Sequence, residues 1–336
     1  MLGHILITAA NAVAPIVLMI ALGYLLGRKG WLNDNFLKVG NWLVFHVCLP
    51  VMLFVNIYSI DSIADVRWDI TGYCVIMVTL LFAIGWVLGN VFTKDPARIG
   101  VIWQCTFRSN FAIIGLPLAQ ALGGDSGAAM AAVLSAFTIP FYNIYSVVAL
   151  SVYTGKRKSA SEVAKSIVTN PLTIGVMAGL VALLLRAAQV AAFDRVVFSV
   201  ERDLPFLYKT MDNLKAITSP LALIILGGQS EFSAVKGMLK EISAAVLARV
   251  AMAPLLAVSV AVALSVWGFL PCGSGEYAAI IALFGSPVAV SSAIMVGSMG
   301  GDKQLATQLV VWTSVLSVAT IFLTVCILMG AGFLVI

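Results

Sequence analysis

Apolar stretches long enough to cross a bilayer follow one another along most of this 336-residue chain. A membrane-spanning helix needs about 20 apolar residues, because it rises about 1.5 Å per residue through a hydrocarbon core about 30 Å thick. We therefore expect an all-α polytopic membrane protein with ten transmembrane helices. The stretches lie near residues 5–27, 37–58, 69–92, 99–121, 126–153, 167–189, 205–229, 243–267, 275–298 and 304–330.

The composition excludes the soluble classes of protein. Only 10% of the residues are charged, whereas a soluble domain has about 25%. A chain with so few charges cannot cover a water-facing globule, which excludes a soluble enzyme and a disordered protein. The five cysteines show no CxxC or Cys/His spacing, so neither a disulfide framework nor a metal site is expected. No Walker A loop or paired acids in the stretches point to ATP use or catalysis, and we expect neither enzymatic activity nor a resident cofactor.

The basic residues assign the two sides of the membrane. The connections after the first, third, fifth, seventh and ninth stretches hold 13 of the 20 Lys and Arg residues, Arg249 included, and the other connections hold six. An excess of Lys and Arg favours the cytoplasmic side. Both termini are therefore expected outside the cytoplasm, and the net charge of +5 reflects topology rather than nucleic-acid binding.

The two halves of the chain resemble each other in spacing. Two pairs of prolines are each 67 residues apart, and a Gly-Gly-Asp triplet occurs twice: Pro50 with Pro117, Pro220 with Pro287, and 123–125 with 300–302. Five spans per half force the second copy to run upside down, which is the inverted repeat of secondary transporters. We expect a first five-helix repeat at 1–153, a cytoplasmic connector at 154–166 and a second repeat at 167–336.

The fourth and ninth stretches carry residues that break helices. Gly115 and Pro117 correspond, 170 residues later, to Gly285 and Pro287, with Ser286 between the last two. Proline removes a backbone donor, and glycine lets the chain unwind. If both helices break here, two helix N-termini with partial positive charge face the middle of the membrane, which suits an anion. The alternative is that each proline only kinks its helix.

Arg108 lies ten positions into the fourth stretch, about 15 Å deep. A charge at this depth costs at least ~2.5 kcal/mol, so it needs a partner. All 15 acidic residues lie in connections or near the ends of stretches. A carboxylate of the substrate is then the natural partner. The alternatives are backbone carbonyls freed by a helix break, or a side chain that reaches back to the cytoplasm.

Further polar residues lie inside the apolar stretches. Asn110 and Ser291 border the predicted breaks and are expected to orient the anion. His46, in the second stretch, either carries a coupled proton or bonds a carbonyl of a neighbouring helix. Gln104 and Asn143 either bind the substrate or a sodium ion or bond between helices.

Motifs spread over nearly the whole chain carry a family resemblance. They are residues 15–28, Leu49-Pro50, 110–117, Asn170-Pro171, 220–223 with 227–228, and 287–317. Together they resemble the auxin efflux carrier family, whose bacterial members include permeases for malonate and other organic acids. Asn110, Pro117 and Pro287 match positions where two broken helices of that family cross, whereas Arg108 is not part of the pattern.

The resemblance implies a ten-helix inverted repeat related to bile-acid sodium symporters and sodium/proton antiporters. Spans 1–2 and 6–7 would form a scaffold and the contact of a homodimer. Spans 3–5 and 8–10 would form a mobile part, with broken helices 4 and 9 crossing at the substrate. This part would move like an elevator. The lack of acidic residues inside the spans distinguishes the chain from antiporters that use a buried carboxylate.

The sequence therefore predicts a secondary transporter of a small organic anion, a mono- or dicarboxylate, in a bacterial cytoplasmic membrane. A proton, sodium or no ion couples transport. The expected partners are the anion, membrane lipids and a second copy of the chain. One alternative is a sodium-coupled symporter of an amphipathic sterol-like or vitamin-like anion. The other is a membrane sensor that binds a ligand without transporting it.

Overall fold

The computed structural model describes residues 2–59, 67–154, 171–229 and 237–336, together with 161, 165, 168 and 169. Over these residues the chain is helical apart from short connections and one isolated β-bridge. The all-α prediction is therefore confirmed. The predicted connector at 154–166, with its basic cluster at 156–158, lies almost entirely outside the described residues, as does Asn170.

The helices occupy each of the ten predicted stretches, in several cases as two or three consecutive segments. In chain order they are α1 (Leu2–Arg28), α2 (Asp34–Leu43), the π-helix η1 (Val44–Cys48), α3 (Leu49–Tyr58), α4 (Trp68–Phe92), α5 (Pro96–Phe107), the π-helix η3 (Phe111–Gly115), α6 (Leu116–Thr154), α8 (Pro171–Phe193), α9 (Val200–Asp203), α10 (Pro205–Gly228), α11 (Leu239–Leu247), the π-helix η4 (Ala248–Met252), α12 (Ala253–Val266), α13 (Ser274–Gly285), α14 (Val290–Met299) and α15 (Lys303–Gly330).

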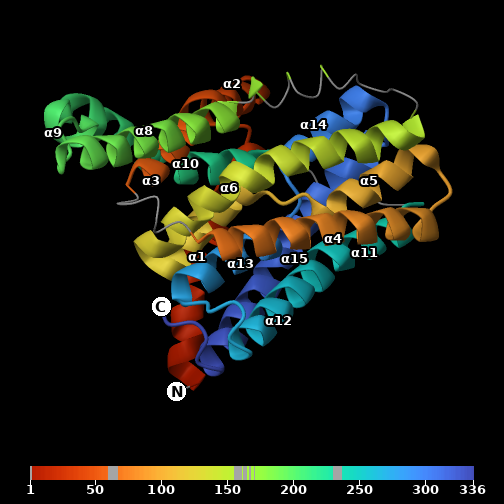
Figure 1. Cartoon of the computed structure of the whole chain (residues 1–336). Helices are drawn as coiled ribbons and strands as arrows, with labels where there is room; N and C mark the ends of the chain where they lie inside the picture. Colours follow the sequence, from red (N-terminus) through yellow and green to blue (C-terminus); the bar gives the residue numbers. More distant parts are fainter. Residues whose placement is uncertain are drawn as a thin grey trace.

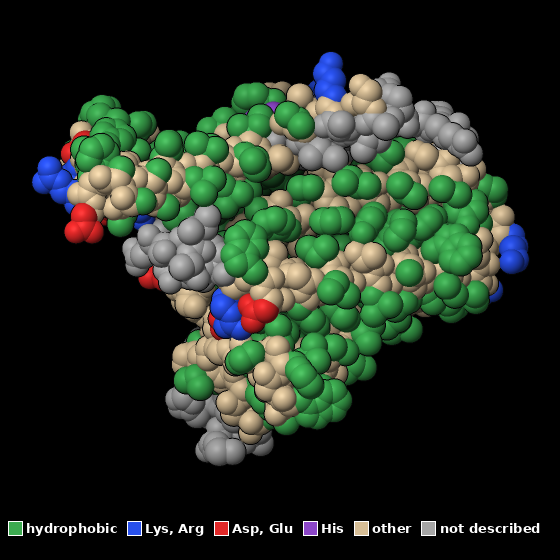
Figure 2. Space-filling model, viewed as in Figure 1, with side chains coloured by type: hydrophobic (Ala, Val, Ile, Leu, Met, Phe, Trp, Pro, Cys, Tyr) green, Lys and Arg blue, Asp and Glu red, His purple; other side chains and the backbone are tan. Residues whose placement is uncertain are grey.

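Six helical segments of the described chain are long and apolar enough to cross a membrane. They are Asp34–Tyr58, Trp68–Phe92, Phe111–Tyr153, Pro171–Phe193, Leu239–Val266 and Lys303–Gly330. Helices α5, α13 and α14 have 10–12 residues and reach only about 15–18 Å, too short to cross alone. Figure 2 shows hydrophobic side chains spread over one face of the molecule and charged ones in a few places, mostly at its edges.

Helix α10 differs from the other long helices because its first half is charged. Lys209, Asp212 and Lys215 all lie within it. Asp212 is two turns inside the helix, half-exposed, and 3.6 Å from the amine of Lys209. The prediction that every acidic residue stays near the end of a span is wrong at this position.

Each of the three π-helices in the described chain ends two residues before a proline. These prolines are Pro50, Pro117 and Pro254. The residue before each proline donates its amide to the carbonyl five positions earlier, in place of the usual four. A proline in a regular helix clashes with the carbonyl four residues back. The wider π-turn moves that carbonyl away, so the helix continues through the proline. Pro117 therefore lies in a continuous helix rather than at a break.

The two Gly-Gly-Asp triplets lie where one helix gives way to the next. Within α6, Gly124 has a φ of 58°, and the segment is two helices that meet at a kink there. At the second triplet, Gly300 has a φ of 82° and ends α14, and Asp302 caps α15. Helices α5 and α13 each have 12 residues, and their ends lie 178 positions apart (96 and 274, 107 and 285). The offset of 178 positions between α5 and α13 agrees within one residue with the offset of 177 between the two triplets. It differs from the offset of 170 between Pro117 and Pro287.

The helices pack in two groups (Figure 1). Group A consists of α1, α2, η1, α3, α8 and α10, and α1 and α3 both lie against α10. Group B consists of α4–α6 and α11–α15, with α13 packed along α6. The groups touch where α1 meets α15 and where α3 and α8 meet α6. Both ends of the chain lie at the same end of the molecule in Figure 1.

Glycines bring α1 and α10 together at backbone distance. A Cβ atom on Gly23 would overlap the backbone oxygen of Ile224, and one on Gly227 would overlap that of Ile20. Small residues allow such close approach in membranes, where van der Waals packing between helices provides much of the attraction. This contact holds the first and seventh predicted spans against each other.

We expect Gly23→Ala to destabilise the protein by about 1–3 kcal/mol or more, because the added methyl group forces α1 away from α10. The measurement is thermal unfolding of the purified protein in detergent. Gly72→Ala in α4 is the matched control, since a Cβ atom there meets nothing within 4 Å. Equal melting temperatures for the two variants would contradict the packing described here.

Candidate functional site

Two helices of group B are interrupted side by side. The first leaves helical geometry after Phe107 and resumes at Phe111. The second leaves it after Gly285 and resumes at Val290. An antiparallel bridge joins Ser109 to Val288. The interruptions therefore lie next to each other although 179 positions separate the bridged residues.

The backbone groups freed by the interruptions find partners within the protein. The amide of Asn110 donates to the carbonyl of Pro287 at 2.7 Å, and the amide of Val288 donates to Oγ1 of Thr313 at 3.2 Å. Irregular backbone is tolerated inside a membrane only where protein or water satisfies it in this way. Pro287 lies within the second interruption, whereas the first contains no proline.

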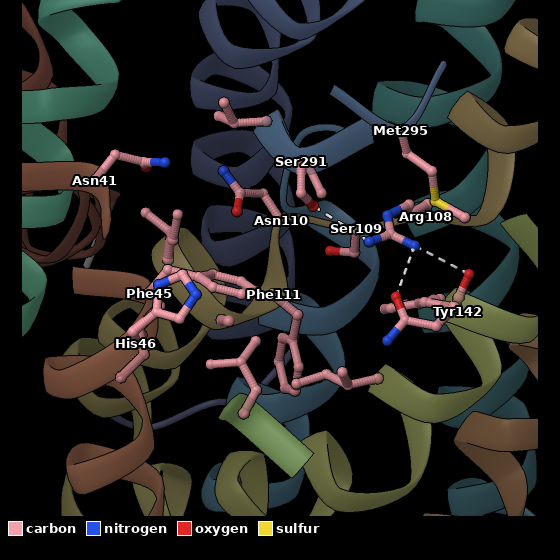
Figure 3. A pocket seen from close by; sticks show the side chains of 18 of the residues that line it. Asn41, Phe45, His46, Arg108, Ser109, Asn110, Phe111, Tyr142, Ser291 and Met295 are labelled. Carbon is pink, nitrogen blue, oxygen red and sulfur yellow. Dashed lines mark hydrogen bonds between the residues drawn. The ribbon is translucent and has the colours of Figure 1, made fainter. Parts of the chain in front are cut away.

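A cavity of about 500 Å³ opens beside the interruptions (Figure 3). Helices α2, η1 and α8 of group A form one side, and the interruptions, η3, α6 and α14 of group B form the other. No acidic side chain is among the described residues that line it. The lining residues are Lys38, Asn41, Trp42, Phe45, His46, Leu49, Arg108, Ser109, Asn110, Phe111, Ala112, Ile113, Ile139, Tyr142, Asn143, Leu172, Ala289, Val290, Ser291 and Met295.

Arg108 is the charged group at the inner end of the cavity, only 8% exposed. Its Nη1 donates to the carbonyl of Tyr142 (3.0 Å), Oδ1 of Asn143 (3.2 Å) and Oγ of Ser146 (2.9 Å). Its Nη2 donates to Oγ of Ser291 at 3.2 Å, and its Nε has no hydrogen-bond partner. All four acceptors are neutral. Nε is buried and unpaired, so the edge formed by Nε and Nη2, which can hold a carboxylate by two parallel bonds, has one unused donor.

The cavity also faces two helix N-termini. Phe111, Ala112 and Ile113 open the helix that continues into α6, and Val290 and Ser291 open α14; all five line the cavity. The first amides of a helix have no acceptor within it, and each N-terminus carries about +0.5 of an elementary charge. Asn110 adds an amide group, 4% exposed, whose Nδ2 has no partner. The inner end of the cavity is thus a concentration of positive charge and unpaired donors.

Arg249, a second arginine, lies fully buried behind the interruptions. Its five hydrogen bonds all go to backbone carbonyls. Nη1 reaches Thr106 and Phe107 at the end of α5, at 3.5 and 3.3 Å. Nη2 reaches Leu283 and Phe284 at the end of α13, both at 3.1 Å, and Nε reaches Ser286 at 2.9 Å.

The charge of Arg249 is balanced by the ends of the two helices that it joins. A helix C-terminus carries about −0.5 of an elementary charge, so two of them match one guanidinium. Among the described residues Arg108 has no such counter-charge, because only one helical carbonyl, that of Tyr142, is among its acceptors. The described structure therefore neutralises one buried arginine and leaves the other without a counter-charge beside the cavity.

One prediction about charge is wrong at Arg249. The sequence places the residue among the cytoplasmic connections, but it lies in η4, inside the eighth span. Without it the comparison of basic residues is 12 against six, which leaves the direction of the bias unchanged. Arg249 is thus a second charge at depth, besides Arg108. The signal that identifies Arg249 is its place six residues inside an apolar stretch and five before Pro254.

Ion pairs hold the outer ends of the interrupted helices. At the start of α5, Arg98 bonds Glu241 and Asp302, each at 3.0 Å. At the start of α13, Glu276 bonds Arg67 at 3.0 Å. Arg67 also bonds Asp69, and this hydrogen bond raises the pKa of the Arg67 guanidinium above its ordinary value. The three acids at the helix starts, Glu241, Asp302 and Glu276, lie about 18 Å from the interruptions, the length of a 12-residue helix.

Five of the predicted site residues line the cavity, and six do not. Those that line it are Arg108, Asn110, Ser291, His46 and Asn143. Gly115 and Pro117 lie farther along the helix in η3 and α6. Gly285 ends α13, Ser286 and Pro287 belong to the second interruption, and none of the three lines the cavity. Gln104 lies behind Met295 and donates to its sulfur at 3.7 Å. Nδ1 of His46 is bonded to Trp42 of its own helix, not to a neighbouring helix.

The comparison with known proteins agrees with this arrangement. The model of a family described as membrane transport protein matches residues 8–325. No curated protein matches the chain. Long apolar helices and an interrupted helix pair beside a cavity suit such a family, and the resemblance to auxin efflux carriers is confirmed. The chain belongs to the auxin efflux carrier family of membrane transport proteins.

Proposed function

We propose that the protein is a secondary transporter of a small organic anion whose carboxylate binds to Arg108 in the cavity. The observation that carries this proposal is the buried charge of Arg108, whose Nε has no partner, in a cavity with no acidic side chain among the described lining residues. A buried charge held by neutral acceptors alone is unfavourable, and a carboxylate that takes up the Nε–Nη2 edge supplies the missing counter-charge. Asn110 and Ser291 are placed to orient it.

The surroundings of Arg108 support an anion over a cation. Both helix N-termini at the interruptions face the cavity, and Arg249 neutralises both C-termini on the far side. Electrostatic attraction from Arg108 and from the two helix N-termini therefore favours negative charge in the cavity.

The shape of the cavity agrees with one carboxylate on an apolar body. Away from Arg108 the walls are formed by Phe45, Phe111, Ile139 and Leu172. A mono- or dicarboxylate with a hydrocarbon part fills this space. The same apolar wall favours the second candidate function, sodium-coupled symport of a larger amphipathic anion.

The placement of the cavity between the two groups suggests how transport occurs. Group A supplies α2 and η1, and group B supplies Arg108 and both interruptions. In our proposal group A is the scaffold and homodimer contact, and group B carries the anion past it as an elevator. This arrangement forms a ten-helix 5+5 inverted repeat, with repeats at 1–153 and 167–336, in the cytoplasmic membrane.

We expect potassium benzoate or succinate to raise the melting temperature of the purified protein with increasing concentration. A ligand present at 100 times its Kd stabilises the folded state by about 2.7 kcal/mol. Matched potassium chloride controls for ionic strength, and replacing potassium by sodium identifies sodium coupling. Uptake of radiolabelled anion into proteoliposomes separates a transporter from a sensor. If a panel of mono- and dicarboxylates neither stabilises the protein nor enters the vesicles, the proposal fails.

A further inference from the structure

A histidine faces the same cavity from group A. His46 lies in the middle of η1, and its Nδ1 is 3.0 Å from the carbonyl oxygen of Trp42. Its ring stacks on that of Trp42, with centroids 4.9 Å apart and planes at 16°. Figure 3 shows the ring across the cavity from Arg108.

The bond to Trp42 determines which nitrogen of His46 is available. A carbonyl oxygen can only accept, so the hydrogen of the neutral ring is on Nδ1. The other nitrogen, Nε2, then has a free lone pair and no hydrogen-bond partner among the described residues. The stacking and the fixed Nδ1 bond hold the ring in place, so a proton taken up by His46 binds at Nε2.

The described groups around His46 are cationic or neutral. Lys38 lies two turns earlier on its own helix, Arg108 belongs to the first interruption, and Tyr142 lines the cavity from α6. On α8 the lining residue is Leu172. On α10, Ile225 packs against α2 and Ser219 bonds Met52 of α3, and the sequence between them, 219–225, contains no titratable residue.

We propose that His46 takes up a proton when an anion occupies the cavity, so that anion binding and proton uptake are linked. This inference rests on the proposed function. The charged residues that line the empty cavity, Arg108 and Lys38, are both positive, so neither can pair with a protonated His46. A bound carboxylate supplies a negative partner, and Nε2 then gains a proton.

The sign of the pH dependence follows from linkage. If the anion increases the proton affinity of His46, protonation must increase the affinity for the anion by the same factor. Histidine is the one side-chain type in the lining that ordinarily changes charge between pH 5 and 8. Anion binding is therefore stronger when His46 is protonated than when it is neutral, so it weakens as the pH rises.

The test is isothermal titration of the purified protein with potassium benzoate at pH 7 in two buffers of different ionisation enthalpy, which yields the number of protons taken up per anion. The wild-type protein is expected to take up a substantial fraction of one proton, and its Kd is expected to rise roughly tenfold from pH 6 to pH 8. His46→Gln keeps a donor for the carbonyl of Trp42 and is expected to bind benzoate with no proton uptake and no pH dependence. His4→Gln, which removes the other histidine of the chain, is the control and should behave as wild type.

Each result bears on one of the two proposals. Benzoate binding without proton uptake, or proton uptake that survives in His46→Gln, overturns the role of His46 and leaves the anion site intact. Wild-type binding in Arg108→Gln overturns the anion site. If His46→Gln does not fold, the wild type is compared with His4→Gln instead. Because the chain has only two histidines, loss of proton uptake in His4→Gln would overturn the role of His46. If neither benzoate nor succinate binds, this inference falls with the anion site.

Discussion

Arg108→Gln is expected to abolish carboxylate uptake into proteoliposomes while the protein still folds. Glutamine keeps a donor for Tyr142, Asn143 or Ser146 but removes the charge and the two-pronged edge. Loss of one partner of a buried charge pair costs about 2–5 kcal/mol, which corresponds to binding weaker by about 30-fold or more. The measurements are initial uptake rates, and thermal unfolding with and without succinate.

Arg108→Lys sharpens this test. Lysine retains the charge but not the planar pair of donors that matches a carboxylate, so we expect weak uptake that saturates only at high concentration. Arg195→Gln is the matched control, because Arg195 is exposed and follows α8, away from the cavity lining. Wild-type uptake by Arg108→Gln would show that the anion binds elsewhere.

Arg249→Met is expected to prevent the protein from folding. Methionine fills a similar volume but leaves five carbonyl oxygens without their donor in a fully buried place. Each unpaired buried polar group costs about 1–3 kcal/mol. For five carbonyls the total cost is comparable to the whole free energy of unfolding of an ordinary domain. The measurement is the yield of monodisperse protein after detergent extraction, compared with that of Arg195→Met.

The conservative variant separates charge from geometry at this position. The ammonium of lysine has three hydrogens and can serve at most three of the five carbonyls. We therefore expect Arg249→Lys to fold with a lowered melting temperature. A yield of Arg249→Met equal to that of the wild type would contradict the role described for this residue.

The helix positions could be predicted from sequence because the length of an apolar stretch determines whether it can cross a membrane. The place of the first interruption could not. Proline at position 117 suggested a break there, but a π-turn absorbs it, and the chain leaves the helix at Arg108 instead. A proline shows where a backbone donor is missing, not whether a break or a wider turn compensates for it.

Part of the candidate site could also be predicted from the sequence. Arg108 stands out because a charge at depth needs a partner, and Asn110 and Ser291 were found through their proximity to the expected breaks. Arg249 is a charge at depth as well, but its partners could not be predicted, because they are main-chain carbonyls, which every residue has. No side-chain pattern in the sequence marks which of them meet the guanidinium.

The five bonds of Arg249 also impose an order on biosynthesis. The carbonyl of Phe107 and the guanidinium that serves it are 142 positions apart along the chain. At about 5–20 residues per second, a ribosome adds the arginine roughly 7–28 s after the phenylalanine. Throughout that interval the newly inserted first half holds an exposed polar helix end within the membrane. The first half thus waits for the eighth span, and the other three acceptors of Arg249, at Leu283, Phe284 and Ser286, are synthesised only after it.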